Sequence, residues 1–165
     1  MKAEEQAEFS EFVAGRWTWL YQAALLLTGD RGHAEDLAQA TLVRVFGSWS
    51  RVRRAENMNA YTMQILINQN KNRFRKLRVE EHLTSAVPDR SDVDSTARSD
   101  QRSALMAALA GLPKRQRAVV LLRYWEGYSE AETAAILGCS AGTVKSQASK
   151  ALAKLRTDAQ VLSSL

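Results

Sequence analysis

Apolar residues recur every three to four positions along two stretches near the start of the chain, a spacing typical of amphipathic helices. Residues 6–28 carry the first apolar face, and Gly29 is expected to end that helix because glycine readily adopts the left-handed conformation of helix caps. Residues 33–49 carry the second apolar face, and a short basic break at residues 50–54 follows. The pattern therefore predicts two helices and an irregular connection after them.

A third helix, expected over residues 58–82 with Asn57 as its N-cap, has two unlike halves. Its first half is apolar, whereas residues 71–78 hold five cations and no acid. Two stripes run along this helix about a quarter turn apart. The apolar stripe is Met63, Ile67, Phe74 and Leu77, and the polar stripe is Gln64, Asn68, Lys71, Arg75 and Arg78. One stripe can be buried while the other faces an anionic partner.

Residues 84–100 differ from what precedes them, because serine and aspartate dominate and little is available for burial. We interpret this stretch as a linker between two domains, residues 1–83 and residues 101–165. Fully extended, it reaches at most about 60 Å. No stretch of the chain shows the alternation of a strand. The predicted fold class is therefore all-α, with two small helical domains joined by a flexible linker.

The second domain opens with Leu105, Leu109 and Leu112, which are expected to face inward before Pro113 breaks the helix. A helix over residues 114–126 follows. Its expected core residues are Val119, Val120, Leu122 and Tyr124.

A helix-turn-helix is predicted over residues 129–156. Ser129 and Glu132 have the spacing of a capping box, which opens a short helix through Leu137. Residues 138–140 form a tight turn, and Ser140 is expected to cap a last helix that ends near residue 156.

The last helix carries a polar face suited to the major groove of DNA, beside an apolar face of Val144, Ala148, Leu152 and Leu155. The polar residues, most of them short, are Thr143, Lys145, Ser146, Ser149 and Lys150. Short side chains permit close approach to DNA, and the two lysines are long enough to reach phosphates. A plain helical hairpin with a solvated basic face is the alternative interpretation of this spacing.

Composition excludes several other classes of protein. Lys and Arg number 23 against 18 Asp and Glu, so the placement of the cations matters more than the net charge of +5. Cys139 is the only cysteine, which excludes an internal disulfide and a cysteine-based zinc site. No metal site, phosphate loop or nucleophile motif is found, so neither an enzyme nor a cofactor is expected. Without a signal peptide or membrane-spanning run, we expect a cytoplasmic protein with no membrane insertion.

Three strings of residues, in this order along the chain, are together specific for one family. They are Ala34–Gln39, Leu112–Val119 and Tyr128–Ser140, the last followed by Gly142–Ser146. On these strings the chain resembles the bacterial RNA polymerase sigma factors of the extracytoplasmic-function (ECF) class, and within it a SigE-like group common in actinobacteria. The resemblance covers nearly the whole chain, with region two in the first domain and region four in the second.

The resemblance implies an alternative sigma factor, which binds core RNA polymerase and directs promoter-specific transcription initiation. It implies that Asp36 and Gln39 contact the clamp helices of the polymerase β′ subunit, and that region four rests on the β flap. Region two would bind and melt the −10 element of promoter DNA, with the segment 50–57 helping to hold a flipped base. Its DNA-facing positions would be Asn68, Lys71, Asn72, Arg75 and Arg78. The last helix of region four would read the −35 element. Whether an anti-sigma factor binds this chain is left open by the resemblance.

Two other functions fit parts of the pattern. A stand-alone helix-turn-helix regulator would bind its site without polymerase, usually as a dimer. The linker and the lack of a symmetric dimer helix weigh against it. A protein-binding module that mimics a partner, such as an antagonist of the anti-sigma type, is disfavoured because the two helical surfaces are basic.

Overall fold

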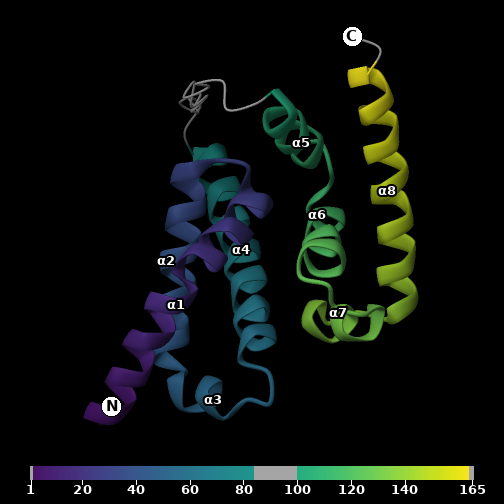
Figure 1. Ribbon diagram of the computed structural model, residues 1–165. Coiled ribbons are helices and arrows are strands. Elements are labelled where there is room, and N and C mark those ends of the chain that lie inside the picture. Colours follow the sequence, from purple (N-terminus) through teal and green to yellow (C-terminus); the bar gives the residue numbers. More distant parts are fainter. Residues whose placement is uncertain (1, 84–99, 164–165) are drawn as a thin grey trace. The chain divides into compact units, whose positions relative to one another are not determined.

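The computed structural model describes the backbone of residues 2–83 and 100–163. Every element within these ranges is helical, which confirms the all-α fold class (Figure 1). The elements are α1 (Ala3–Thr28), α2 (Arg31–Gly47), α3 (Trp49–Arg54), α4 (Met58–Leu83), α5 (Asp100–Ala110), α6 (Lys114–Val120), the π-helical turn η1 (Leu121–Trp125), α7 (Glu130–Leu137) and α8 (Ala141–Ser163). The chain divides into two compact units, one with most of α1 together with α2, α3 and α4, and one with α5 to α8.

The linker expected at residues 84–100 lies, apart from its last residue, outside the described residues. None of the helices in the described ranges is long and apolar enough to cross a membrane.

An aromatic cluster forms part of the core of the first unit. Phe12 of α1, Val45 of α2, and Trp49 and Val52 of α3 are buried together. The rings of Phe9 and Phe12 meet the Trp49 ring edge-on, with centroids 5.4 and 5.3 Å apart. Edge-to-face pairs of this kind stabilise a fold beyond the burial of their area. The cluster thus ties α1 to both α2 and α3.

The helix α4 packs along α2 and follows the two predicted stripes. Met63 and Ile67 of the apolar stripe are buried, and Phe74 and Leu77 are half-buried. On the polar stripe, Gln64, Asn68, Lys71 and Arg75 are exposed. The Asn57 Oδ1 accepts a hydrogen bond from the Ala60 N–H at 3.0 Å, which confirms Asn57 as the N-cap. Gly29, at φ 73°, is left-handed as expected.

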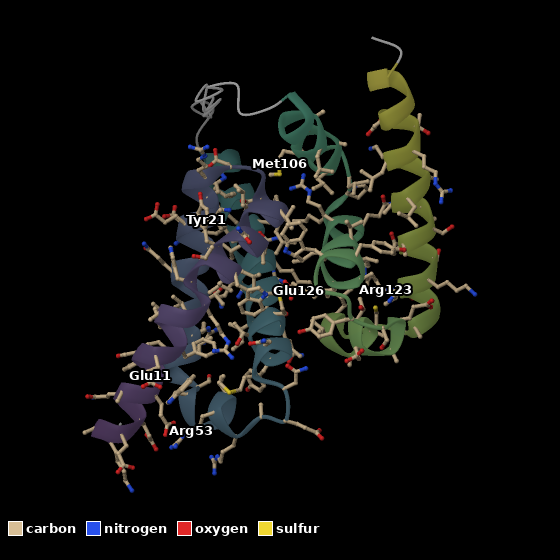
Figure 2. The ribbon with its side chains drawn as sticks, in the orientation of Figure 1. Glu11, Tyr21, Arg53, Met106, Arg123 and Glu126 are labelled. Carbon is tan, nitrogen blue, oxygen red and sulfur yellow. The ribbon has the colours of Figure 1, made fainter. Side chains whose placement is uncertain are left out.

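The irregular break expected at residues 50–54 is wrong, because this stretch belongs to the helix α3. Trp49, expected to end the preceding helix, instead begins α3. Arg53, labelled in Figure 2, pairs with Glu5 and Glu8 of α1 at 3.0 and 2.8 Å. A helix of six residues is too short to show a periodic pattern, and its cations suggested a solvated connection. Its contacts with α1 supply the stability that local sequence does not.

The second unit buries Leu109 and Leu112 against Ala151 of α8. Two cations cover carbonyl groups at the C-terminal end of α5. The Lys154 Nζ donates to the Gly111 carbonyl, and the Arg117 Nη2 donates to the Ala110 carbonyl at 2.7 Å. Carbonyls at a helix end lack partners within the helix, so these donors complete α5.

The helix expected over residues 114–126 changes its geometry midway. After α6 the chain forms η1, a wider turn that shifts the register of the residues following it. Val119 and Leu122 are buried as expected, and Val120 is partly buried. Tyr124 is 48% exposed, so its assignment to the core is wrong. The prediction that Leu105 faces inward is also wrong, because this side chain is 52% exposed.

The predicted helix-turn-helix is formed by α7 and α8. The Ser129 Oγ accepts from the Glu132 N–H, and the Glu132 Oε1 accepts from the Ser129 N–H, each at 3.0 Å, which confirms the capping box. The bond from the Ser129 N–H, together with the nearby Ser129 hydroxyl, lowers the pKa of the Glu132 carboxyl. Gly138 turns the chain at φ 69°, and the Ser140 Oγ caps α8 by accepting from the Thr143 N–H at 3.1 Å. The helix α8 continues to Ser163, beyond its expected end near residue 156.

Candidate nucleic-acid interface

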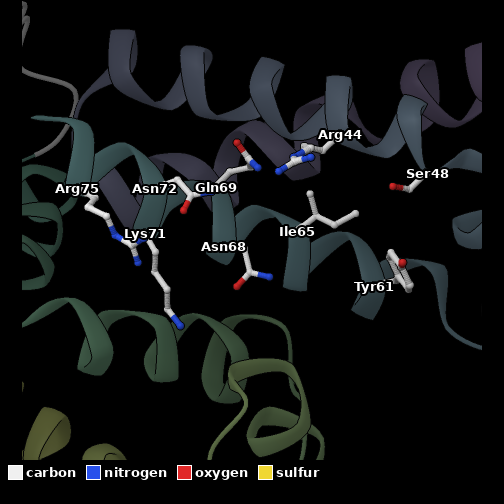
Figure 3. Close-up of a pocket in the computed structure, with 9 residues that line it drawn as sticks. All are labelled: Arg44, Ser48, Tyr61, Ile65, Asn68, Gln69, Lys71, Asn72 and Arg75. Atoms are coloured by element: carbon white, nitrogen blue, oxygen red, sulfur yellow. The ribbon is translucent and has the colours of Figure 1, made fainter.

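A groove of about 460 Å³ between α2 and α4 gathers most of the polar stripe of the first unit (Figure 3). The α2 side contributes Arg44 and Ser48. The α4 side contributes Tyr61, Ile65, Asn68, Gln69, Lys71, Asn72 and Arg75. The groove thus brings together four of the five residues expected to face the −10 element. The side chain of the fifth, Arg78, lies outside the described residues.

The lining of the groove is cationic. Among the residues that the structure describes, Arg44, Lys71 and Arg75 line it and no carboxylate does. All three side chains are exposed, and none of them forms a hydrogen bond or ion pair with any residue that the structure describes. Three positive charges without a pairing acid in the described part of the chain make the groove attractive to an anion.

Along the same groove lie an aromatic ring and several amides. Tyr61 and Ile65 are half-buried and pack against the aromatic cluster of the first unit. Asn68, Gln69 and Asn72 add amide groups, each of which both donates and accepts hydrogen bonds. An aromatic surface, hydrogen-bonding amides and nearby cations are the features that bind single-stranded nucleic acid.

Two lining residues, Arg44 and Ser48, are absent from the sequence-based site. Arg44 belongs to α2 and Ser48 directly follows that helix, and Figure 3 shows Arg44 and Gln69 pointing toward each other from α2 and α4. A signal for them was present in the sequence, because Arg44 lies off the apolar face of its helix and Ser48 follows four residues later. Residues four apart share a helix face. What the sequence did not show is that this face borders α4.

The second candidate surface is the polar face of α8. Lys145, Ser146, Ser149 and Lys150 are all exposed, while Val144, Ala148 and Ala151 on the other side are buried. Lys145 and Ser146 lie in the first two turns of the helix, and Ser149 and Lys150 lie in the third. The N-terminal turns are the part that a recognition helix inserts into the major groove. The arrangement of these four residues therefore follows the predicted face.

Thr143 differs from the other residues expected to read the −35 element. It is half-buried, and its hydroxyl lies 2.9 Å from the Ser140 hydroxyl. Its backbone N–H is also bonded to Ser140. Thr143 therefore helps to build the N-terminus of α8 and is less available to DNA than its neighbours.

Asp36 and Gln39, the expected polymerase contacts, are both exposed on α2. The Gln39 Nε2 donates to the Glu35 Oε1 at 3.4 Å. Gln39 and Arg44 are five residues apart, which separates them by about 140° around the helix axis. The helix α2 thus presents one face at Gln39 and another to the groove.

Comparison with known families agrees with the two units. Residues 17–79 match the family described as Sigma-70 region 2, and residues 102–155 match Sigma-70, region 4. The first match spans the groove, and the second spans the helix-turn-helix.

Curated relatives match over most of their length. The RNA polymerase sigma-E factor of Streptomyces avermitilis is 42% identical over 93% of this chain and 86% of that protein. The ECF RNA polymerase sigma factor SigL of Mycobacterium tuberculosis is 34% identical over 95% of this chain and 89% of that protein.

A solved structure shares the fold. The sigma factor RpoE from Bartonella quintana, crystallised in complex with the anti-sigma factor NepR, is 26% identical to this chain. The alignment covers 93% of this chain and 98% of that one, with a TM-score of 0.77. Regions two and four are both present, and full-length relatives are more than 30% identical. The chain therefore belongs to the ECF sigma factors, a non-enzymatic family that directs RNA polymerase to promoters through regions two and four.

Proposed function

We propose that the groove between α2 and α4 holds the unpaired strand of the −10 element while α8 reads the −35 element. The observation that carries this proposal is the groove itself, in which Lys71 and Arg75 lie with Asn68 and Asn72, Tyr61 lies toward the other end, and no acid lines it among the described residues. A melted strand offers phosphates to the cations and bases to the ring and amides. The first domain would act over residues 1–83 and the second over residues 101–165.

At the −35 element, the exposed residues of α8 would make two kinds of contact. Lys145 and Lys150 would contact phosphates, and Ser146 and Ser149 would approach base edges. Thr143 would support the helix start through Ser140. Base contacts supply the specificity, whereas phosphate contacts fix the register of the helix.

Core polymerase would be bound at two places. Asp36 and Gln39, exposed on α2, would contact the β′ clamp helices. Region four would rest on the β flap, and this is supported by apolar side chains of α5 and η1 that face solvent. These are Leu105, Tyr124 and Trp125, which are 52%, 48% and 54% exposed.

An anti-sigma factor is proposed as a further partner, and the site of action as the cytoplasm, where polymerase and chromosome meet. The RpoE structure from Bartonella quintana holds the anti-sigma factor NepR and aligns with this chain over nearly its whole length, which supports the partner proposal.

Run-off transcription tests the proposed function. Purified core polymerase from the host and fragmented host DNA would be combined with the protein, and the 5′ ends of the transcripts mapped. Discrete transcripts that require the protein are expected, with a shared −10 and −35 element upstream. Sequence-specific DNA binding without polymerase, and no transcripts, would contradict the proposal.

Charge reversal in the groove tests the role of α4. Lys71→Glu and Arg75→Glu are each expected to lower open-complex formation on a mapped promoter by roughly tenfold or more, because each replaces a phosphate contact by repulsion. Core polymerase binding should change little. Open complexes would be measured by permanganate reactivity of unpaired thymines, and polymerase binding by fluorescence anisotropy.

Lys76→Glu is the matched control. Lys76 is exposed on the same helix but does not line the groove, so it tests the effect of charge alone. An equal loss of open complexes in Lys76→Glu, or a parallel loss of polymerase binding in Lys71→Glu, would contradict the proposal that the groove binds the −10 element.

A further inference from the structure

We propose that Arg44 of α2 holds a backbone phosphate of the unpaired strand, on the wall of the groove opposite Lys71 and Arg75. This inference rests on the proposed binding of the −10 strand in the groove. It adds a second helix to the contact, because the sequence-based site lies on α4 alone. The strand would then be held between two helices.

The position of Arg44 is the first reason. It lines the groove together with Ser48, whereas the other lining residues belong to α4 (Figure 3). Ser48 lies near Tyr61 in that view, and Lys71 and Arg75 lie toward the other end. Tyr61 and Arg75 are fourteen positions apart on α4, which corresponds to about 21 Å of helix. Several nucleotides can lie along that length, with Arg44 beside the middle of the strand.

The second reason is that no acid among the described residues pairs with Arg44. Its guanidinium is exposed and makes no hydrogen bond or ion pair within the part of the chain that the structure describes. Arg53 of the neighbouring helix α3 shows the contrast, since Glu5 and Glu8 hold it. An arginine that lines a groove without an acid is available for a bidentate contact with a phosphate.

The ring and the amides that line the groove point to single-stranded nucleic acid as the ligand rather than an acidic peptide. Carboxylates would satisfy Arg44 and Lys71 but would leave the ring of Tyr61 and the amides of Asn68 and Asn72 without a function. A nucleotide uses all of them, because its base has a π face and hydrogen-bonding edges. The volume of about 460 Å³ lies in the range of pockets that take small ligands.

The test uses the full-length chain bound to core polymerase. The probe is a promoter fragment, mapped by the run-off experiment, whose non-template strand is left unpaired across the −10 element. Arg44→Ala is expected to weaken binding of this probe roughly tenfold at moderate salt. It should also lower the slope of log K against log salt concentration by about 0.7, the value for one phosphate contact on a single strand.

Two further variants make the result specific. Arg44→Lys keeps a positive charge, so it is expected to retain the salt slope, but it should lose part of the affinity because lysine cannot form the bidentate contact. Arg31→Ala removes a cation from the same helix, outside the groove lining, and is expected to leave both quantities unchanged. Binding of core polymerase should be equal in all variants, because Arg44 lies about 140° around α2 from Gln39, and about 80° around and about 12 Å along the helix from Asp36.

Three outcomes would overturn the inference. Arg44→Ala binding the probe as tightly as Arg31→Ala would show that no phosphate is held. Weaker binding with an unchanged salt slope would assign Arg44 a purely structural role. A matching loss of polymerase binding would make it a polymerase contact. If Lys71→Glu still weakens binding of the probe in these cases, the proposed function stands and only the proposed Arg44 contact is contradicted.

Discussion

At the scale of single residues, the same side-chain type serves different purposes according to what lies beside it. Arg53 is paired with Glu5 and Glu8, whereas Arg44 lines a groove without acids. Lys154 donates to the Gly111 carbonyl and so completes α5. A count of cations therefore overstates the number that are available to DNA, and the neighbours of each cation decide its role.

Glu132 gives a pH-dependent prediction at this scale. Its hydrogen bonds with Ser129 lower its pKa in the folded state below the ordinary value of 4.5 for a glutamate carboxyl. Near that pH the unfolded chain then binds more protons, so the stability from this carboxylate is fully present above about pH 4.5 and is lost as the pH falls through the folded pKa. Glu132→Gln should therefore be less stable than the parent at pH 7 and should approach it in acid. Urea unfolding at several pH values would measure this.

Glu130→Gln serves as the control for Glu132→Gln. It removes a carboxylate from the same first turn of α7 but leaves the capping box intact. A difference between parent and Glu132→Gln that stays constant with pH, or one that Glu130→Gln reproduces in full, would contradict the capping explanation.

At the scale of elements, α3 depends on the side chains that anchor it. Trp49 is 3% exposed, and its ring meets the rings of Phe9 and Phe12 of α1. The Trp49 Nε1 is buried without a hydrogen-bond partner among the described residues. The anchor is therefore apolar packing, and α3 in turn positions the start of α4 at Asn57.

Replacing Trp49 tests this anchor. Trp49→Ala is expected to cost the first unit about 3–5 kcal/mol of unfolding free energy, because it leaves a large cavity. Trp49→Phe should cost clearly less, since it removes an unpaired N–H whose burial costs about 1–3 kcal/mol. Urea unfolding followed by circular dichroism would measure both. Val43→Ala, at a residue 70% exposed, should stay within about 0.5 kcal/mol of the parent. Equal losses in Trp49→Ala and Trp49→Phe would contradict packing as the anchor.

At the scale of the whole molecule, two small units share one chain. Each would bind DNA through a modest surface, a groove in one and a helix face in the other. Joining them converts the second binding event into an intramolecular one, which raises affinity without any new contact. A linker over residues 84–100, as the sequence predicts, would set the effective concentration of one unit at the site of the other.

Lengthening this segment tests the joint engagement. Doubling it with glycine and serine should lower the effective concentration by about threefold, since that quantity falls as roughly the −3/2 power of length. Promoter binding by the holoenzyme should weaken by the same factor when both elements are present. The same insertion after Leu165 is the control. An unchanged affinity would show that the polymerase, and not the linker, fixes the spacing of the two units.

The helices with long repeats or strong end signals were predictable from the sequence. Gly29, Asn57 and the Ser129 capping box each act through contacts with residues close in the chain, so the sequence alone determines them. The polar faces of α4 and α8 follow from periodicity in the same way. Three sequence strings were also sufficient to identify the family, because the order and spacing of motifs are properties of the chain itself.

Other features were decided by tertiary structure. The helix α3 forms because Trp49 and Arg53 find partners on α1, far away in the sequence. The turn η1 shifts the register and exposes Tyr124, which a regular helical period would bury. Arg44 enters the groove because α2 packs along α4. Local patterns thus fixed the faces of the helices, whereas long-range packing decided which faces meet and which side chains share a site.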